Sequence, residues 1–149
     1  MKPILANSLL ALAAALFLAT PALAESFTVV EHATSDTTAH LGKAEKNLGD
    51  LLVFANEVYD AANKTKVGTD QGFCIRITLG TAYECYWTLK LKDGQIMVQG
   101  PDVDGGDSML AVTGGTGKYR DVRGEMKLHP RNPKGTEYDF AYSLDHAGK

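Results

Sequence analysis

Residues 71–100 read QGFCIRITLGTAYECYWTLKLKDGQIMVQG, three segments rich in β-branched and aromatic residues that are separated by two turns. Gly80-Thr81 marks the first turn. The Asp93-Gly94 pair marks the second, because Asp-Gly favours the positive φ angles of a two-residue hairpin loop. The three segments therefore predict an antiparallel meander. Its strands are expected at Gln71–Thr78, Tyr83–Leu91 and 95–100.

The same alternation of short apolar segments and turns continues on both sides of the meander. Further strands are expected at Ser26–Ala33, Gly49–Asp60, Ser108–Thr113, about 118–129, and Thr136–His146. The links include a polar connection at 34–47 and a loop at 61–70. Eight antiparallel strands with mostly hairpin-length links suit a closed up-and-down barrel whose interior holds side chains or one small ligand. A β-sandwich is the rival interpretation, because periodicity does not separate the two folds.

The first 24 residues differ from the rest of the chain. They read MKPILANSLLALAAALFLATPALA, with Lys2 before an apolar run and small residues at Ala22 and Ala24. This pattern is typical of a secretory signal peptide that is cleaved after Ala24. The apolar run is shorter than the ~18 residues of a membrane span, and no later segment reaches that length. We therefore expect residues 25–149 to form one barrel domain that is secreted or periplasmic and not inserted in a membrane.

Charge and motifs exclude several classes of function. The 149 residues carry 15 Lys and Arg against 18 Asp and Glu, which disfavours a protein that binds nucleic acid by neutralising phosphates. The four histidines show no metal-ligand spacing, and no GxSxG, P-loop or HExxH motif occurs. The glycine cluster GGTG at 114–117 is interpreted as a bend between strands, since no helix follows it. The sequence therefore predicts no metal, no cofactor and no nucleic-acid partner.

The two cysteines flank the first turn of the meander. If Thr78 pairs with Thr81, Cys74 lies directly opposite Cys85, and export makes a disulfide chemically permissible. The alternative is that Cys74 lines a cavity as a free thiol. Both interpretations stay open at this point.

Glu31 is the acidic residue of the apolar segment VVEHA. If its side chain points into the barrel, burial raises its pKa toward neutrality and makes the carboxyl a usable proton-transfer group. The alternative is a solvated side chain on the outer face of the strand.

Arg76 is expected on the same strand face as Cys74, so an inward Cys74 places Arg76 in the lumen or at its mouth. There its charge could neutralise a ligand carboxylate, and the alternative is an ion pair with an acidic residue at the rim. Tyr59, Tyr86 and Trp87 are candidates to wall a cavity, or else belong to the core or an oligomer interface.

Four segments carry a family resemblance. They are GDLLVFANEVYD, VGTDQGFCIRI, IMVQGPDV and DSMLAVTGGTGKYRDVRGEMKL. In this order they resemble the plant allene oxide cyclases and their bacterial relatives, and more distantly the plant dirigent proteins, over roughly Phe27 to Leu144. The resemblance implies an eight-stranded antiparallel barrel of lipocalin-like shape, often trimeric, with an apolar cavity. It also implies a cofactor-free activity in which the cavity acts as a chiral mould for a fatty-acid allene oxide.

The resemblance also assigns catalytic roles. Glu31 would transfer a proton or stabilise charge, Asn56 would donate a hydrogen bond, and Cys74 would form part of the cavity wall. The leading hypothesis is a cofactor-free cyclase or isomerase that binds a small apolar or fatty-acid-derived substrate, with a homotrimer as the implied assembly. The alternative hypothesis is a non-catalytic, dirigent-like protein that binds and orients a hydrophobic ligand.

Overall fold

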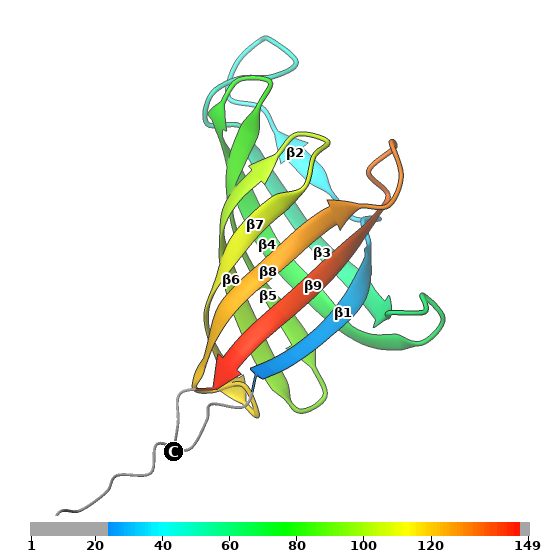
Figure 1. Cartoon of the computed structure of the whole chain (residues 1–149). Coiled ribbons are helices and arrows are strands. Elements are labelled where there is room, and N and C mark those ends of the chain that lie inside the picture. The colour runs from blue at the N-terminus through cyan, green and yellow to red at the C-terminus, as the bar shows by residue number, and fades with distance from the viewer. Residues whose placement is uncertain (1–23, 147–149) are drawn as a thin grey trace, which may run out of the picture.

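The computed structural model describes residues 24–146, and this part of the chain folds into one antiparallel sheet that closes on itself (Figure 1). The strands are β1 (Ala24–His32), β2 (Thr37–Ala39), β3 (Leu51–Asp60), β4 (Lys66–Thr78), β5 (Ala82–Leu91), β6 (Gly94–Val103), β7 (Ser108–Gly117), β8 (Val122–Pro130) and β9 (Glu137–His146). From β3 to β9 each strand pairs with the next along the chain. No helix in the described residues is long and apolar enough to cross a membrane.

The barrel closes where β1 and β2 share one edge of β3. Val29–His32 of β1 pair with Glu57–Asp60, whereas the short β2 pairs with Leu51–Val53. Along its other edge β1 pairs with β9. The predicted eight-stranded antiparallel barrel is therefore confirmed, with β2 as an extra strand, and the sandwich alternative is wrong. β2 was not predicted, because it is only three residues long and lies in a polar connection without a periodic pattern.

Three predicted segments differ from the structure. The loop predicted at 61–70 is shorter, because β4 already begins at Lys66. The glycine cluster at 114–117, predicted as a bend, continues β7 and pairs with β6. The strand predicted to begin near Lys118 begins at Val122. Within the predicted signal peptide, residues 1–23 lie outside the described residues.

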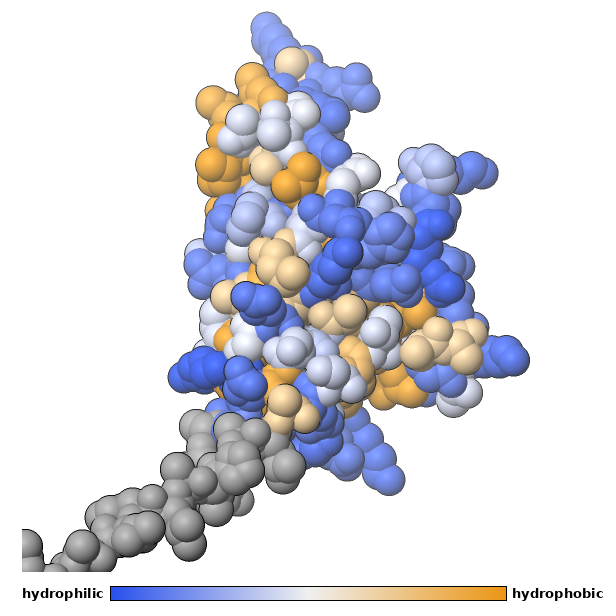
Figure 2. All heavy atoms as spheres, viewed as in Figure 1, coloured by the Kyte–Doolittle hydropathy of each residue, from blue (hydrophilic) through white to orange (hydrophobic). Residues whose placement is uncertain are grey.

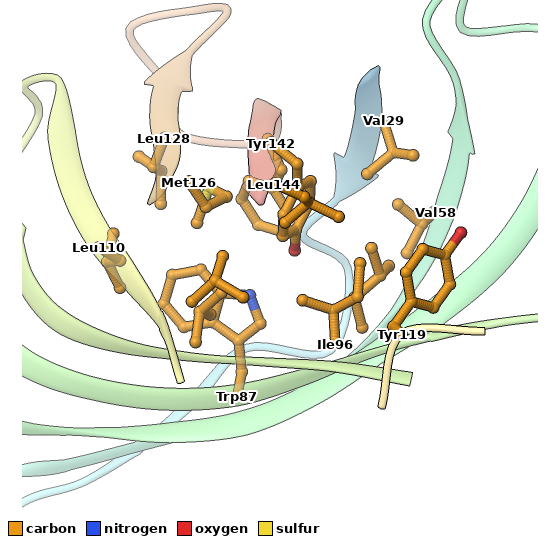
Figure 3. Packing of buried hydrophobic residues seen from close by; sticks show 14 of the residues in the cluster. Val29, Val58, Trp87, Ile96, Leu110, Tyr119, Met126, Leu128, Tyr142 and Leu144 are labelled. Atoms are coloured by element: carbon orange, nitrogen blue, oxygen red, sulfur yellow. The ribbon is translucent and has the colours of Figure 1, made fainter. Parts of the chain in front are cut away.

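The barrel interior is filled by the alternate side chains of each strand, which point inward because successive residues of a strand face opposite sides. Fully buried members include Leu89, Ile96, Leu110, Met126 and Leu144, and Figure 3 shows four of these, Ile96, Leu110, Met126 and Leu144, around Trp87 and Tyr142. Burying one such aliphatic side chain contributes about 1.5–3 kcal/mol. The packed interior leaves only limited room for a ligand.

Gly72 makes room for the largest side chain of this interior. It pairs with Trp87 across β4 and β5, and a Cβ atom at Gly72 would overlap the Cβ of Trp87 and the carbonyl oxygen of Tyr86. Only glycine therefore allows this close approach of the two strands. The indole of Trp87 consequently lies in the barrel, 5.4 Å from the ring of Phe140 between centroids.

Candidate functional site

The break between β1 and β2 builds the centre of the site. The chain leaves the sheet after His32 and returns at Thr37, so that residues 33–36 lie over the part of β3 that neither strand covers. The backbone N–H groups of Thr34 and Ser35 donate to Oδ1 of Asn56 at 3.1 and 3.0 Å. These two donors fix which end of the Asn56 amide is the oxygen.

The other end of the Asn56 amide holds two carboxyl groups in place. Nδ2 donates to Oε1 of Glu31 at 2.8 Å and to Oδ1 of Asp36 at 2.9 Å. Asn56 is 1% exposed, and both the oxygen and the nitrogen of its side chain form hydrogen bonds within the protein. It acts as a positioning residue for Glu31 and Asp36, which come from β1 and from the connection that follows it.

Asp70 of β4 forms a buried acid pair with Glu31. The backbone N–H of Asn56 donates to Oδ1 of Asp70 at 3.3 Å, while Oδ2 has no partner among the described residues. Burial, and then the charge of Asp70, raise the pKa of Glu31 well above its usual range. Burial raises the pKa of Asp70 to about 7. The pair therefore retains a proton at neutral pH, because two adjacent buried carboxylates repel each other.

A cavity of about 60 Å³ lies beside this pair. Its lining comprises three acidic residues, Glu31, Asp36 and Asp102, four aromatic residues, Phe54, Trp87, Tyr138 and Phe140, and the smaller Leu52, Cys74 and Leu128. Burial raises the pKa of Asp102 to about 6 and that of Tyr138 to about 12. The Tyr138 hydroxyl is therefore neutral at physiological pH and can donate a hydrogen bond.

Two further polar atoms face the interior without a partner. The indole Nε1 of Trp87 and the hydroxyl oxygen of Tyr142 are buried and make no hydrogen bond within the described residues. Figure 3 shows both side chains in the barrel interior. Trp87 also lines the cavity, whereas its Nε1 atom is itself buried.

Cys74 and Cys85 form a disulfide, and they are paired directly across β4 and β5. Neither of them is a free cysteine, so the alternative of a free cavity thiol is wrong. The turn itself differs slightly from the prediction, since Thr78 pairs with Ala82 after a register shift. Cys74 still lines the cavity, as half of a disulfide rather than as a thiol.

Arg76 lies in the barrel but does not line the cavity. Its Nη1 donates to Oδ1 of Asp104 at 2.7 Å, and its guanidinium stacks over the ring of Tyr83 at 3.6 Å from the centroid. Lys46 adds a second cation near Asp104, with Nζ 3.6 Å from Oδ2. Arg76 therefore forms an ion pair with an acidic residue at the rim, which is the alternative to binding a ligand carboxylate.

Tyr59 and Tyr86 lie on the outer face of the barrel, away from the cavity. Tyr59 stacks on His32 and donates to Oε2 of Glu57 at 2.8 Å, whereas Tyr86 stacks on Phe73. Alternation explains both positions, because their neighbours Val58 and Trp87 point inward. Of the three aromatic candidates, only Trp87 walls the cavity.

Sequence reasoning missed Asp36, Asp70, Asp102 and Tyr138. Asp70 lies four residues before Cys74 in β4, on the same face of the strand, so alternation could have identified it. It was missed because the sequence predicts a strand that begins only at Gln71. Asp102 and Tyr138 also lie in strands and follow the inward alternation. Asp36 carried no signal, because its position depends on the break between β1 and β2. Within residues 24–146, no group of three or more His, Cys, Asp or Glu side chains could hold a metal ion.

The fold and the site together define a closed antiparallel barrel with a proton-holding pair of carboxyl groups beside a small aromatic cavity. The family model described as Allene oxide cyclase matches residues 27–140. The chain therefore belongs to the allene oxide cyclase family.

Solved structures share the fold at low sequence identity. A pyocyanin demethylase is 22% identical, with a TM-score of 0.68, over 79% of this chain and 100% of its own. A pterocarpan synthase dirigent protein is 15% identical, with a TM-score of 0.73, over 89% of this chain and 90% of its own. An exo-specific intermolecular Diels–Alderase is 20% identical, with a TM-score of 0.64, over 83% of this chain and 98% of its own. Identities this low show a common barrel and nothing more specific.

Proposed function

We propose that the protein is a cofactor-free cyclase or isomerase that folds a small apolar molecule within the barrel cavity. The observation that carries this proposal is the carboxyl of Glu31, which lines the cavity, is held by Asn56 and is buried beside Asp70. A carboxyl that keeps its proton at neutral pH is suited to general acid catalysis. Membership of a family named for a cyclisation supports the same class of reaction.

The proposed role of Glu31 is to stabilise negative charge on a substrate oxygen as a ring closes or a double bond moves. Glu31 would donate its proton, or a strong hydrogen bond, to that oxygen, and would recover the proton when the product carbonyl forms. The neutral hydroxyl of Tyr138 would serve as a second donor. The aromatic walls, with Trp87 and Phe140 among them, would exclude water and restrict the substrate to one folded conformation.

This proposal predicts an enantiomerically enriched product. Incubating the mature protein with a fatty-acid allene oxide is expected to give one cyclopentenone enantiomer in excess, faster than the spontaneous reaction. Glu31→Gln is expected to lower the rate at least ~100-fold, the typical contribution of a positioned acid. Glu125→Gln, which changes an exposed side chain of β8, is the matched control and is expected to leave the rate unchanged. A racemic product formed at the spontaneous rate would contradict the cyclase proposal.

A second candidate function is non-catalytic binding of a hydrophobic ligand, as a dirigent-like protein. It is favoured by the Asn56 amide, whose oxygen and nitrogen are both committed to internal hydrogen bonds and leave no donor for a substrate. The same incubation separates the two candidates. A non-catalytic protein would bind the ligand saturably but leave its rate of conversion at the spontaneous value.

We also propose that exported copies assemble as a homotrimer through an apolar outer face. Exposed apolar side chains lie on β3 to β6, around an outer groove of about 680 Å³. They include Val53, Phe73, Tyr86 and Met97. Figure 2 shows further hydrophobic residues gathered at the upper left, at the end of the barrel. The disulfide supports export, because such bonds persist mainly in oxidising compartments.

One measurement tests both the assembly and the export. Native mass spectrometry of the protein purified from its source is expected to show three copies of a chain that begins at Glu25. A monomer, or a chain that retains residues 1–24, would contradict the corresponding part of the proposal. The number of copies and the removal of residues 1–24 change the measured mass independently. The assembly and the export are therefore tested separately.

A further inference from the structure

We propose that Trp87 and Tyr142 act as positioning residues for the acid pair. Together with Asp70 they bind one internal water molecule, which stabilises the ionised form of Asp70 and so keeps the proton of the pair on Glu31. The site is separate from the cavity, because neither Asp70 nor Tyr142 is among the cavity-lining residues. The inference deepens the proposed function, on which its catalytic consequence rests, because it identifies what keeps Glu31 protonated for acid catalysis.

Three buried polar atoms from three different strands lack a partner among the described residues. They are Oδ2 of Asp70, Nε1 of Trp87 and the hydroxyl oxygen of Tyr142. Buried polar groups without a protein partner are ordinarily satisfied by an internal water molecule that makes two to four hydrogen bonds. The carboxylate accepts, the indole donates and the hydroxyl can do either. The three atoms therefore have the chemistry of a site for one water molecule.

The three side chains converge in the barrel interior. Gly72 pairs with Trp87 across β4 and β5, so Asp70, two residues earlier on the same face, lies diagonally opposite the indole. Figure 3 shows the indole nitrogen of Trp87 and the hydroxyl oxygen of Tyr142 turned toward one another. Burial, and then the charge of Asp70, raise the pKa of Tyr142, whereas the indole of Trp87 lowers it. Tyr142 is therefore near both groups without a direct bond to either, which suits a bridging water.

Stacking fixes the two aromatic side chains of this site. The ring of Tyr142 lies 5.0 Å from that of Phe27 between centroids, with 17° between the planes. The indole of Trp87 packs between Phe140, at 5.4 Å, and Phe54, at 6.0 Å. Rings held in this way keep their polar atoms in place. The hydroxyl and the indole N–H are consequently positioned for one small ligand before it binds.

The surroundings of the pair favour ionisation of Asp70 rather than Glu31. Burial raises the pKa of both acids, and contact between the two carboxyl groups then raises that of Glu31 further and lowers that of Asp70. Asp70 accepts from the backbone N–H of Asn56 through Oδ1, and Oδ2 would accept from the water. Donors to a carboxylate favour its ionised form. The water therefore adds to a preference that leaves the proton on Glu31, at the cavity.

Other titratable groups face the pair from several elements, and none of them is a cation. They are Asp36 of the connection after β1, Asp102 of β6, and Tyr138 and Tyr142 of β9. The acidic members oppose ionisation of both carboxyl groups equally in sign, so they do not select one of them. Selection is left to the hydrogen-bond donors.

A crystal structure of the mature protein tests the water site directly. In crystals grown at about pH 8, where Asp70 is ionised, one ordered water is expected within about 3.2 Å of Oδ2 of Asp70, Nε1 of Trp87 and the hydroxyl oxygen of Tyr142. A structure of sufficient resolution to place internal waters, with none at these three atoms, would overturn the proposal.

Tyr142→Phe tests the effect on the acid pair. Carbon-13 NMR of the carboxyl groups, without substrate, is expected to show the lower pKa of the pair raised by about 0.5 or more, because ionised Asp70 loses support. Tyr119→Phe is the matched control, since Tyr119 is also buried and also packs against Phe27. Its hydroxyl lies near Lys118 instead, and the variant is expected to leave the pKa unchanged. An equal pKa in the parent protein and Tyr142→Phe would refute the positioning role.

The indole of Trp87 provides a second reporter in the unaltered protein. Trp87 is the one tryptophan of the sequence, so its N–H gives a single indole signal in nitrogen-15 NMR. This signal is expected to shift with pH at the midpoint of the lower pKa of the pair, and to lose that shift in Asp70→Asn. An indole signal that is independent of pH between pH 5 and pH 9 would contradict the link to Asp70.

Failure of this inference and failure of the proposed function are distinguishable, because these measurements need no substrate. A racemic cyclisation product together with the expected water and the raised pKa would remove the cyclase and leave the positioning role. An enriched product together with an unchanged pKa in Tyr142→Phe would leave the cyclase and remove the positioning role.

Discussion

Asp70→Asn is expected to stabilise the protein at pH 7 by about 2–4 kcal/mol. Asp70 is fully buried, and burial raises its pKa from 3.8 to about 7. An acid with a raised folded-state pKa keeps its proton after the unfolded chain has released it. Its contribution to stability is therefore complete below the unfolded pKa and is lost as pH rises through the folded pKa. Three units of pKa correspond to about 4 kcal/mol, the upper end of the expected gain, and Asn removes this penalty.

The pH dependence gives the sharper test of this prediction. The free energy of unfolding of the parent protein is expected to fall between about pH 4 and pH 7, and Asp70→Asn should reduce that slope. Acidic groups whose pKa is lowered do not mask this change in the free energy of unfolding between pH 4 and pH 7. Although burial alone would raise the pKa of Asp50, hydrogen bonds from His40 and from backbone amides lower it to about 2. Asp50 therefore acts below pH 4.

Urea unfolding at several pH values measures this effect. Asp145→Asn, at an exposed position of β9, removes an acid of the same type from the surface and serves as the control. It is expected to keep the slope of the parent protein. If Asp70→Asn and Asp145→Asn gave the same pH profile as the parent, the acid pair would not be buried in the way described.

Loss of the disulfide is the second change with a large expected effect. Replacing both cysteines, as Cys74→Ala with Cys85→Ala, is expected to lower the free energy of unfolding by about 3 kcal/mol. The cysteines are 11 residues apart in sequence, and the chain-entropy relation for a loop of this size gives that magnitude. The loss arises mainly because the unfolded chain gains freedom when the link is absent.

A second double variant separates the link from the volume of its atoms. Cys74→Ala with Cys85→Val restores part of the buried volume but not the covalent bond. Both double variants are expected to unfold at a similarly lower urea concentration than the parent protein. Recovery of the parental midpoint by the Val variant would show that packing, and not the covalent link, provides the stability.

The local parts of the fold could be predicted from the sequence because they depend on neighbouring residues. Asp-Gly at 93–94 and the alternation on either side of the first turn identified the meander, and the pairing of Cys74 with Cys85 follows from that register. The family resemblance supplied the closure of the barrel. Periodicity alone did not, since closure depends on β1 pairing with both β3 and β9.

The candidate site was only partly predictable because its contacts join distant segments. Glu31 was identified from one acidic residue in an apolar segment, and its inward position is explained by the alternation of β1. Its partner Asp70 was missed because KVGTD, the start of β4, lacks an apolar run. The pairing of Arg76 with Asp104 depends on the loop that follows β6, which no pattern near Arg76 indicates. Tyr59 and Tyr86 have the aromatic side chains expected of a cavity wall, but the alternation of β3 and β5 places both on the outer face.

The central claim is that Glu31 and Asp70 share a proton at neutral pH beside the cavity. Carbon-13 NMR of the side-chain carboxyl groups, recorded from pH 3 to pH 9, measures this directly, with Glu31→Gln and Asp70→Asn to assign the two signals. We predict that the pair releases its protons in two separate steps, one of them near pH 7 or above. Two carboxyl groups that both titrate below pH 5 would contradict the account.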